Sequence, residues 1–338
     1  MKKTLLALAV LAASSSVSAA EIYGSETSKV SVKGEVDAYL AAGEVEKLDG
    51  TKDEKDADIY TWAKIQMDAE HKLNSDFTAF ASFEIETKDI AGGDSTAKFD
   101  DVYVGVKTDT WGVAAGEVGD LAESMDAIQK DDITNEGNYM GSTGGHHRES
   151  AGHGVVFKGE FVEGLVLVAD VNTTSDKDVD NTYGISADYS FSNFSVGASF
   201  LTGDAEKDVD YSVMGVSASA EFGGLYLAAT FASYEGNDGY GYWDSASKLS
   251  GTTMGVAAAY QLDKTRLYTT YAIANADEDT KTGASLGAAE VDMTNLVVGV
   301  DYAVLDNITI FAEYQMADYD SVKTYDASTA IAGVYYAF

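Results

Sequence analysis

The sequence predicts an all-β protein in which sixteen antiparallel strands follow one another as an up-and-down barrel. Two observations carry this prediction. Segments of about ten residues alternate apolar and polar side chains with a period of two, which places them on opposite faces of a strand. The connections alternate between tight turns, such as GG at 223–224, and long acidic loops, as in a meander with its turns at one end. We expect strands at residues 29–42, 58–72, 77–87, 98–108, 111–118, 153–161, 164–173, 182–190, 194–202, 211–222, 225–234, 252–262, 265–275, 291–304, 307–317 and 328–338.

The alternation is clearest in the first segment, which reads VSVKGEVDAYLA at residues 30–41. One of its faces carries apolar side chains that include Val36, whereas the other face carries Glu35 and further polar residues. The segment at 77–86 repeats the pattern, with Phe83 on its apolar face. We therefore expect each strand to have one apolar and one polar face.

The pattern favours a barrel that crosses a membrane. No stretch of the mature chain has eighteen consecutive apolar residues, so no transmembrane helix is predicted. In hydrocarbon every backbone N–H and C=O group must be paired, and strands achieve this only in a closed sheet. An even number of alternating segments with unequal connections is typical of outer-membrane barrels. The alternative is a secreted soluble β-sandwich, which also alternates but rarely uses so many strands.

The two ends of the chain support export. The N-terminus, MKKTLLALAVLAASSSVSAA, has two lysines, an apolar core and a run of small residues. This predicts a signal peptide at residues 1–19, cleaved after Ala19, which leaves a single barrel domain at residues 20–338. The last expected strand ends on Phe338. Since that strand must pair with the first one, we expect Phe338 at the closing seam, where aromatic girdles meet the membrane boundary.

The composition excludes several function classes. The formal net charge is −34, which disfavours nucleic acid as a partner because its phosphates require a basic surface. The chain has no cysteine, so disulfide bonds and thiol catalysis are impossible.

Four short motifs resemble those of the general porins of the Gram-negative outer membrane. They are AEIYG at 20–24, LNSDFTAFASFEIE at 73–86, YVGVK at 103–107 and AGVYYAF at 332–338. The resemblance implies a bacterial outer-membrane location and a homotrimer in which each barrel holds its own pore, narrowed by an inward-folded third loop. The terminal Phe338 resembles the signal read by the outer-membrane assembly machinery, so this machinery and the surrounding lipid and lipopolysaccharide are implied partners.

The third loop fits residues 119–152, the longest connection expected. A connection of this length without alternation is unusual unless it is functional. Its middle, MDAIQKDDITNEG at 125–137, resembles the family's constriction segment. The resemblance implies that Asp131, Asp132 and Glu136 contribute carboxylates at the narrowest point of the pore. The alternative is a solvated loop outside the barrel.

The opposing wall of the pore departs from the family pattern. The family places an arginine cluster there, but this sequence has two arginines, Arg148 and Arg266. Local matching places Lys64 at one of the cation positions and places Glu35 and Glu117 at others, with Arg148 as a further candidate. The electric field that acids and arginines on opposite walls create across the pore is therefore not expected in its usual form.

The interior charges instead predict a preference for cations. A negatively charged channel with low-dielectric walls concentrates cations and excludes anions. We therefore predict passive diffusion of ions and small hydrophilic solutes through a water-filled, cation-preferring pore. A solute-specific channel and a surface receptor or adhesin remain alternatives. The expected interior acids are Glu35, Asp37, Asp68, Glu70, Glu84, Glu86, Glu117, Asp170, Asp188 and Glu313, against the cations Lys33, Lys64, Lys72 and Arg266.

Other chemistry is weakly indicated. The histidine-rich stretch HHRESAGH at 146–153 lies among glycines, whereas a metal site needs a closed shell of ligands. Ser150 lies three residues before a histidine, a spacing that does not define a catalytic triad. The DKDVD stretch at 176–180 begins like a calcium loop, but Asn181 and Ala187 stand where glycine and glutamate are required. We therefore predict no enzyme activity, no metal site and no cofactor, except divalent cations that bridge acidic loops to lipopolysaccharide.

Overall fold

The computed structural model describes residues 20–47, 51–87, 96–119, 121–135, 154–238, 248–279, 284–285, 291–320 and 325–338. The predicted signal peptide, residues 1–19, lies outside this part of the chain. The secondary structure is almost entirely β, with one 3₁₀ helix, η2 (Ser124–Ile128), among the described elements. No helix in the described ranges is long and apolar enough to cross a membrane.

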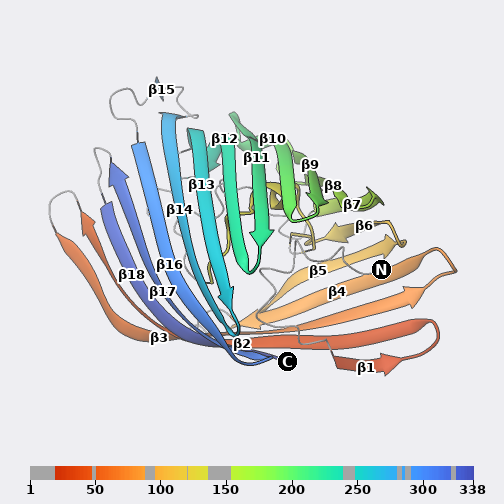
Figure 1. The fold of residues 1–338 in the computed structure, drawn as a ribbon. Coiled ribbons are helices and arrows are strands. Elements are labelled where there is room, and N and C mark those ends of the chain that lie inside the picture. The colour runs from red at the N-terminus through yellow and green to blue at the C-terminus, as the bar shows by residue number, and fades with distance from the viewer. Residues whose placement is uncertain are drawn as a thin grey trace.

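Sixteen long strands follow one another around a closed antiparallel sheet (Figure 1). Each long strand pairs with the long strands before and after it, and β18 pairs with β2 to close the ring. Every expected segment is a strand, and the short β1 (Ala20–Gly24) and β15 (Ala284–Ser285) are additional. The long strands are β2 (Ser28–Lys47), β3 (Lys52–Lys72), β4 (Thr78–Thr87), β5 (Ala97–Lys107), β6 (Trp111–Gly116), β7 (Gly154–Val162), β8 (Leu165–Asn172), β9 (Thr182–Phe191), β10 (Phe194–Glu206), β11 (Val209–Phe222), β12 (Leu225–Asp238), β13 (Lys248–Leu262), β14 (Thr265–Asp279), β16 (Val291–Leu305), β17 (Ile308–Asp320) and β18 (Tyr325–Ala337).

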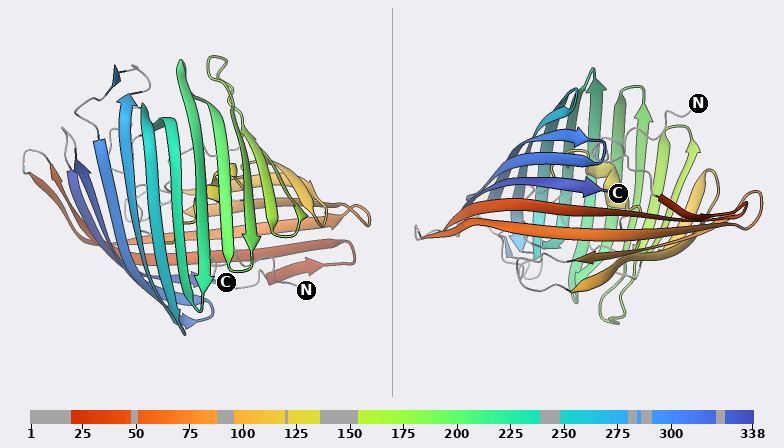
Figure 2. Two further views of the ribbon diagram at one scale, coloured as in Figure 1. Left: turned by 45° about the horizontal axis from the view of Figure 1, so that its top comes forward. Right: turned by 90° about the horizontal axis from the view of Figure 1, so that it is seen from below.

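The seam between β18 and β2 extends to the last residue. Tyr336 lies opposite Val36 in the register of the two strands. Beyond the end of β18, the Phe338 N–H donates to the Gly34 carbonyl at 2.8 Å, and the Gly34 N–H donates to the Phe338 carbonyl at 2.9 Å. Figure 2 shows the C-terminus beside β2. The expected pairing of the last strand with the first is confirmed.

The two faces of the sheet differ as the alternation predicts. Large apolar side chains remain exposed on one face, with Val36 at 44% and Ile310 at 46%. Glu84 and Glu313 point to the opposite face and are only 3% and 4% exposed. Because the sheet is closed, the exposed apolar side chains form its outer surface, the face that the sequence assigns to lipid.

An aromatic girdle marks the end of the barrel that carries the tight turns. Phe191 and Phe194 flank the turn at 192–193, and their rings stack with centroids 5.7 Å apart. Phe222, beside the next tight turn, meets the Phe194 ring edge-on at 5.5 Å. Aromatic side chains in such positions are typical of the boundary between lipid and water.

At the end that carries the long loops, the polarity of the two faces reverses. Asp318 and Asp326 lie opposite each other on β17 and β18 and are both exposed. Their neighbours Ala317 and Ala327 face the interior and belong to one buried apolar cluster. The strands thus continue beyond the apolar outer belt, because the ladder of backbone hydrogen bonds does not require apolar side chains on the outer face. For this reason the strand expected at 307–317 continues to Asp320, and the strand expected at 328–338 already begins at Tyr325.

Candidate functional site

The segment after β6 lies against the polar face of the sheet. Helix η2 packs against strands β8 to β12. Its Met125 and Ile128 are fully buried and join the same apolar cluster as Leu201 and Val213. On its polar side, Ser217 Oγ donates to the Ala127 carbonyl at 2.5 Å. The helix is therefore held both by apolar packing and by a hydrogen bond from the strands.

Glycines on three adjacent strands provide the space for η2. They are Gly184 on β9, Gly197 on β10 and Gly215 on β11. A Cβ atom on Gly197 would overlap the Ala127 carbonyl group, and one on Gly215 would lie 2.6 Å from Ile128 Cδ1. Real Cβ atoms essentially never approach other atoms so closely. We call these three residues the glycine bed.

Carboxylates of the neighbouring strands hold the segment beyond the glycine bed. The Ser124 N–H donates to Asp170 Oδ2 at 2.6 Å. Lys130 forms an ion pair with Asp188, and that carboxylate also accepts a hydrogen bond from Ser195 Oγ at 2.6 Å. The acids that the sequence assigned to the interior at positions 170 and 188 therefore bind the segment.

The far end of the segment reaches the opposite part of the wall. The Asn135 N–H donates to Glu313 Oε1 at 2.6 Å, and Asn135 Nδ2 donates to the Tyr268 hydroxyl at 2.8 Å. The Tyr268 hydroxyl in turn donates to Glu313 Oε1 at 2.6 Å. Arg266 lies over the Tyr268 ring at 4.4 Å and pairs with Asp301 at 2.6 Å. Residues 124–135 are thus attached at both ends, to β8–β12 and to β14 and β17.

The predicted constriction carboxylates lie in different environments. Asp131 is 5% exposed and therefore faces the wall, whereas Asp132 is half-buried. Glu136 lies outside the described residues. Asp126, which the sequence did not single out, is exposed although it accepts a hydrogen bond from the Glu123 N–H at 3.0 Å. The sequence could have indicated Asp126 as a pore-facing acid, because this residue lies within the expected constriction motif.

The structure brings two of the predicted wall residues together. Glu35 lies opposite Lys64 in the register of β2 and β3, and Lys64 Nζ pairs with Glu84 Oε2 at 3.2 Å. Glu117 lies apart from them, in the connection after β6, where its N–H donates to the Val102 carbonyl at 3.0 Å. Burial raises the pKa of Glu117, and the nearby Asp100 carboxylate raises it further. Arg148 lies outside the described residues.

The described cations on this face are largely matched by acids. Lys64, Lys107, Lys130 and Arg266 pair with Glu84, Glu70, Asp188 and Asp301, respectively. Each such pair neutralises one carboxylate. The face carries further lysines and further carboxylates, and the carboxylates outnumber the lysines, so its surplus charge is negative. The lysines are Lys29, Lys33, Lys72, Lys98 and Lys158, and the carboxylates are Glu35, Asp37, Asp68, Glu86, Asp100, Asp170 and Glu313.

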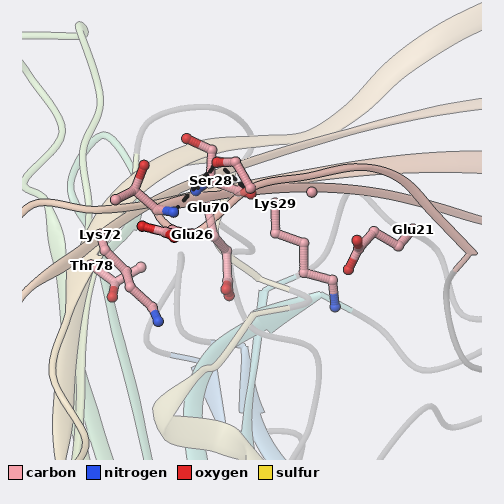
Figure 3. A pocket seen from close by; sticks show the side chains of 10 residues that line it. Glu21, Glu26, Ser28, Lys29, Glu70, Lys72 and Thr78 are labelled. Carbon is pink, nitrogen blue, oxygen red and sulfur yellow. Dashed lines mark hydrogen bonds between the residues drawn. The ribbon is translucent and has the colours of Figure 1, made fainter.

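A pocket lies at the tight-turn end, between the β1–β2 turn and β3 (Figure 3). It is lined mainly by Ser, Thr, Glu and Lys side chains, including Glu70 and Lys72. Among the described residues, no group of three His, Cys, Asp or Glu side chains is arranged to hold a metal ion. The predicted histidine-rich stretch at 146–153 lies outside the described ranges. In the 176–180 stretch, Asp178 pairs with Lys177 and Lys207 at 3.5 and 3.6 Å.

Comparison with protein families and curated proteins gives consistent matches. A family model described as Gram-negative porin matches residues 7–321. The outer membrane porin protein OmpD of Salmonella typhimurium is 24% identical over 363 residues, which cover 97% of this chain and 97% of that protein. OmpD of Citrobacter koseri is 27% identical over 262 residues, with 69% of this chain and 70% of that protein covered.

Three solved structures share the fold. OmpF of Salmonella typhi, in complex with daunomycin, has a TM-score of 0.69 at 20% identity, covering 94% of this chain and all of that one. The trimer form of OmpT from Vibrio cholerae has a TM-score of 0.67 at 19% identity and covers 93% of this chain and 100% of that one. An anion-selective porin from Comamonas acidovorans has a TM-score of 0.70 at 12% identity, with coverage of 92% and 100%.

Proposed function

Because this chain belongs to the Gram-negative porin family, we propose that it forms a water-filled, cation-preferring pore for the passive diffusion of ions and small hydrophilic solutes. It is a multi-pass β-barrel of the bacterial outer membrane. Its relatives are porins, which are channels, and nothing in the comparisons points to catalysis. What the family does not fix is which ions pass and what narrows the pore.

The attachment of residues 124–135 at both ends is the observation that carries the proposal. In a closed sheet, a segment on the polar face lies in the interior, where it narrows the passage. This supports an inward-folded third loop over a solvated loop outside the barrel. The narrowest point then lies between the exposed or half-buried acids of the segment, Asp126 and Asp132, and the wall around Glu35 and Lys64.

The surplus of carboxylates on the polar face supports the preference for cations. The fold does not decide this property, because a barrel with a TM-score of 0.70 to this one belongs to an anion-selective porin. The preference for cations or anions depends on the sign of the interior charge, since a charged channel with low-dielectric walls concentrates counter-ions.

Reversal potentials of purified protein in a planar bilayer with a KCl gradient test the proposal. We expect a potential of the sign that K⁺ permeation gives, and a stronger preference in dilute salt because screening weakens as the ionic strength falls. A preference for chloride, or none at low salt, would contradict the assignment. If the barrel shows no conductance at all, the proposal of a pore is contradicted and a receptor role is favoured.

A homotrimer is part of the proposal. The solved OmpT of Vibrio cholerae is described in a trimer form, and this chain shares its fold. Stepwise conductance in threes and a trimer mass in detergent are the expected results, whereas a stable monomer with single steps would contradict it. Recognition by the assembly machinery would use the last strand, whose terminal Phe338 closes the seam with Gly34.

Divalent cations that bridge the barrel to lipopolysaccharide are a further part of the proposal. Beyond the apolar belt, the exposed Asp318 and Asp326 face each other, and Glu46 lies opposite Asp326 on the next strand. Phosphates of the lipid would complete the ligand shell around Mg²⁺ or Ca²⁺, which prefer oxygen ligands. A chelator should lower the thermal stability of the protein only when lipopolysaccharide is present. An equal effect without lipopolysaccharide would contradict the bridge.

A further inference from the structure

Aromatic side chains form a continuous strip on the polar face of four adjacent strands. Phe311 on β17 stacks on Tyr335 of β18, with ring centroids 4.6 Å apart and planes at 7°. Tyr39 on β2 stacks on Tyr60 of β3 at 5.4 Å and 13°. Gly333 lies between the two stacks. These four rings, with Trp62 of β3, are called the aromatic strip below.

Gly333 allows the two stacks to meet. A Cβ atom at this position would lie 2.5 Å from Phe311 Cε1 and 2.6 Å from Tyr39 Cβ. The register places Gly333 opposite both Phe311 and Tyr39. The Phe311 ring therefore covers the glycine and ends where Tyr39 begins, so the strip continues across the seam that closes the barrel.

The strip faces the interior and stays accessible there. Phe311 is 5% exposed, but Tyr39, Tyr60, Trp62 and Tyr335 all keep intermediate exposure. The lipid-facing aromatic residues of the same strands are different ones. They include Tyr314 and Tyr336, at 43% and 42% exposure.

Carboxylates border the strip. Asp37 lies opposite Tyr335 on one side and opposite Trp62 on the other, and is 5% exposed. Trp62 Nε1 donates to Glu86 Oε2 at 3.0 Å. The adjacent cations are Lys64, which lies opposite Glu35 and pairs with Glu84, and Lys98, which lies opposite Glu86. The rings are thus set in a part of the wall where acids outnumber the cations.

An ammonium group already lies on the strip. The Nζ atom of Lys64 lies 5.2 Å from the centroid of the Trp62 ring. Aromatic faces attract cations through the ring quadrupole, and several rings with nearby carboxylates form the usual recognition site for quaternary ammonium groups. The contact shows that the wall accommodates such a group beside a ring.

We propose that the aromatic strip is a binding subsite for organic ammonium ions that carry an apolar or aromatic group. This inference rests on the proposed pore and adds a substrate class to it. The rings hold the apolar part of the solute by stacking, while the surplus acids, including Asp37 and Glu86, attract its charge. The arginine cluster that the sequence lacks at this wall would repel such a solute.

The test uses purified trimer in a planar bilayer, with benzyltrimethylammonium as the probe and benzyl alcohol and benzenesulfonate as neutral and anionic counterparts. We expect concentration-dependent interruptions of the K⁺ current with benzyltrimethylammonium, and markedly weaker ones with the other two. Equal interruptions by benzyl alcohol would show that stacking alone acts and would overturn the ammonium class. A normal K⁺ current without any interruption would overturn the subsite but leave the pore intact.

Variants locate the subsite. Tyr39→Leu combined with Tyr60→Leu removes one stack, and we expect the residence time of the probe to fall about tenfold, as for the loss of a cation–π contact. Tyr39→Phe with Tyr60→Phe keeps the ring faces and should retain wild-type residence. Tyr314→Leu, on the outer face, is the matched control. If the double leucine variant does not assemble, Tyr335→Leu serves the same purpose. Unchanged residence in the leucine variants that assemble would overturn the assignment.

Discussion

Replacing Gly197 with alanine tests whether residues 124–135 set the width of the pore. A Cβ atom at Gly197 would lie 2.8 Å from the carbonyl carbon of Ala127 and would overlap its oxygen, whereas ordinary contact begins at 3.4 Å. Strand β10 is fixed on both sides by the ladders to β9 and β11. The carbon contact alone requires helix η2 to move about 0.6 Å away from the wall, and the overlapping oxygen requires a larger shift. This movement is directed into the pore.

The displacement also costs stability. It lengthens the hydrogen bond from Ser217 Oγ to the Ala127 carbonyl, which contributes about 1 kcal/mol. Overpacking of a well-filled site costs about 1–3 kcal/mol. We expect the folding free energy to fall by about 2–4 kcal/mol, and the single-channel conductance to fall because the helix enters the passage.

Single-channel recording and urea unfolding in detergent micelles measure these two effects. Gly112→Ala on β6 is the matched control, because its new Cβ atom would lie 3.2 Å from Lys107 Cβ and would require a shift of only a few tenths of an ångström. The control should keep wild-type conductance. If Gly197→Ala also conducts like the wild type while it loses stability, η2 does not limit the current and the proposed constriction lies elsewhere.

Three further predictions concern the wall and the segment. Lys64→Gln removes the cation that pairs with Glu84, so the reversal potential in a KCl gradient should shift further toward that of K⁺. Because the pKa of Glu117 is raised, this carboxylate should lose its charge at a higher pH than ordinary glutamates, which titrate at about pH 4.3. When selectivity is recorded against pH, the cation preference of the wild type should therefore begin to fall at a higher pH than that of Glu117→Gln, which lacks this titrating group. Tyr268→Phe removes the hydroxyl that accepts from Asn135 Nδ2 and donates to Glu313, so the thermal midpoint should fall, by an amount equivalent to about 1–3 kcal/mol. An unchanged midpoint would show that this hydroxyl contact is dispensable.

The strands could be predicted from the sequence because the alternation of apolar and polar residues is a local property. Val36 and Glu35 differ in face whatever happens elsewhere in the chain, and a closed sheet then follows from the need to pair every backbone group. The anchor of the segment could not be predicted in this way. Asn135 and Glu313 are 178 positions apart, and their contact depends on how the segment crosses the barrel. The burial of Asp131 has the same origin, since the same motif is compatible with a wall-facing or a pore-facing carboxylate.

The aromatic strip was missed for a different reason. The sequence shows Tyr39, Tyr60 and Tyr335 as separate members of polar faces, and only the register decides that they become neighbours. A shift of the β2–β3 register by two residues would keep every side chain on its face but would separate Tyr39 from Tyr60. Alternation determines which side of the wall a residue faces, whereas the register determines its neighbours on the adjacent strands. The proposed charge preference can therefore be predicted from composition and alternation, but any selectivity for the shape of a solute depends on the register.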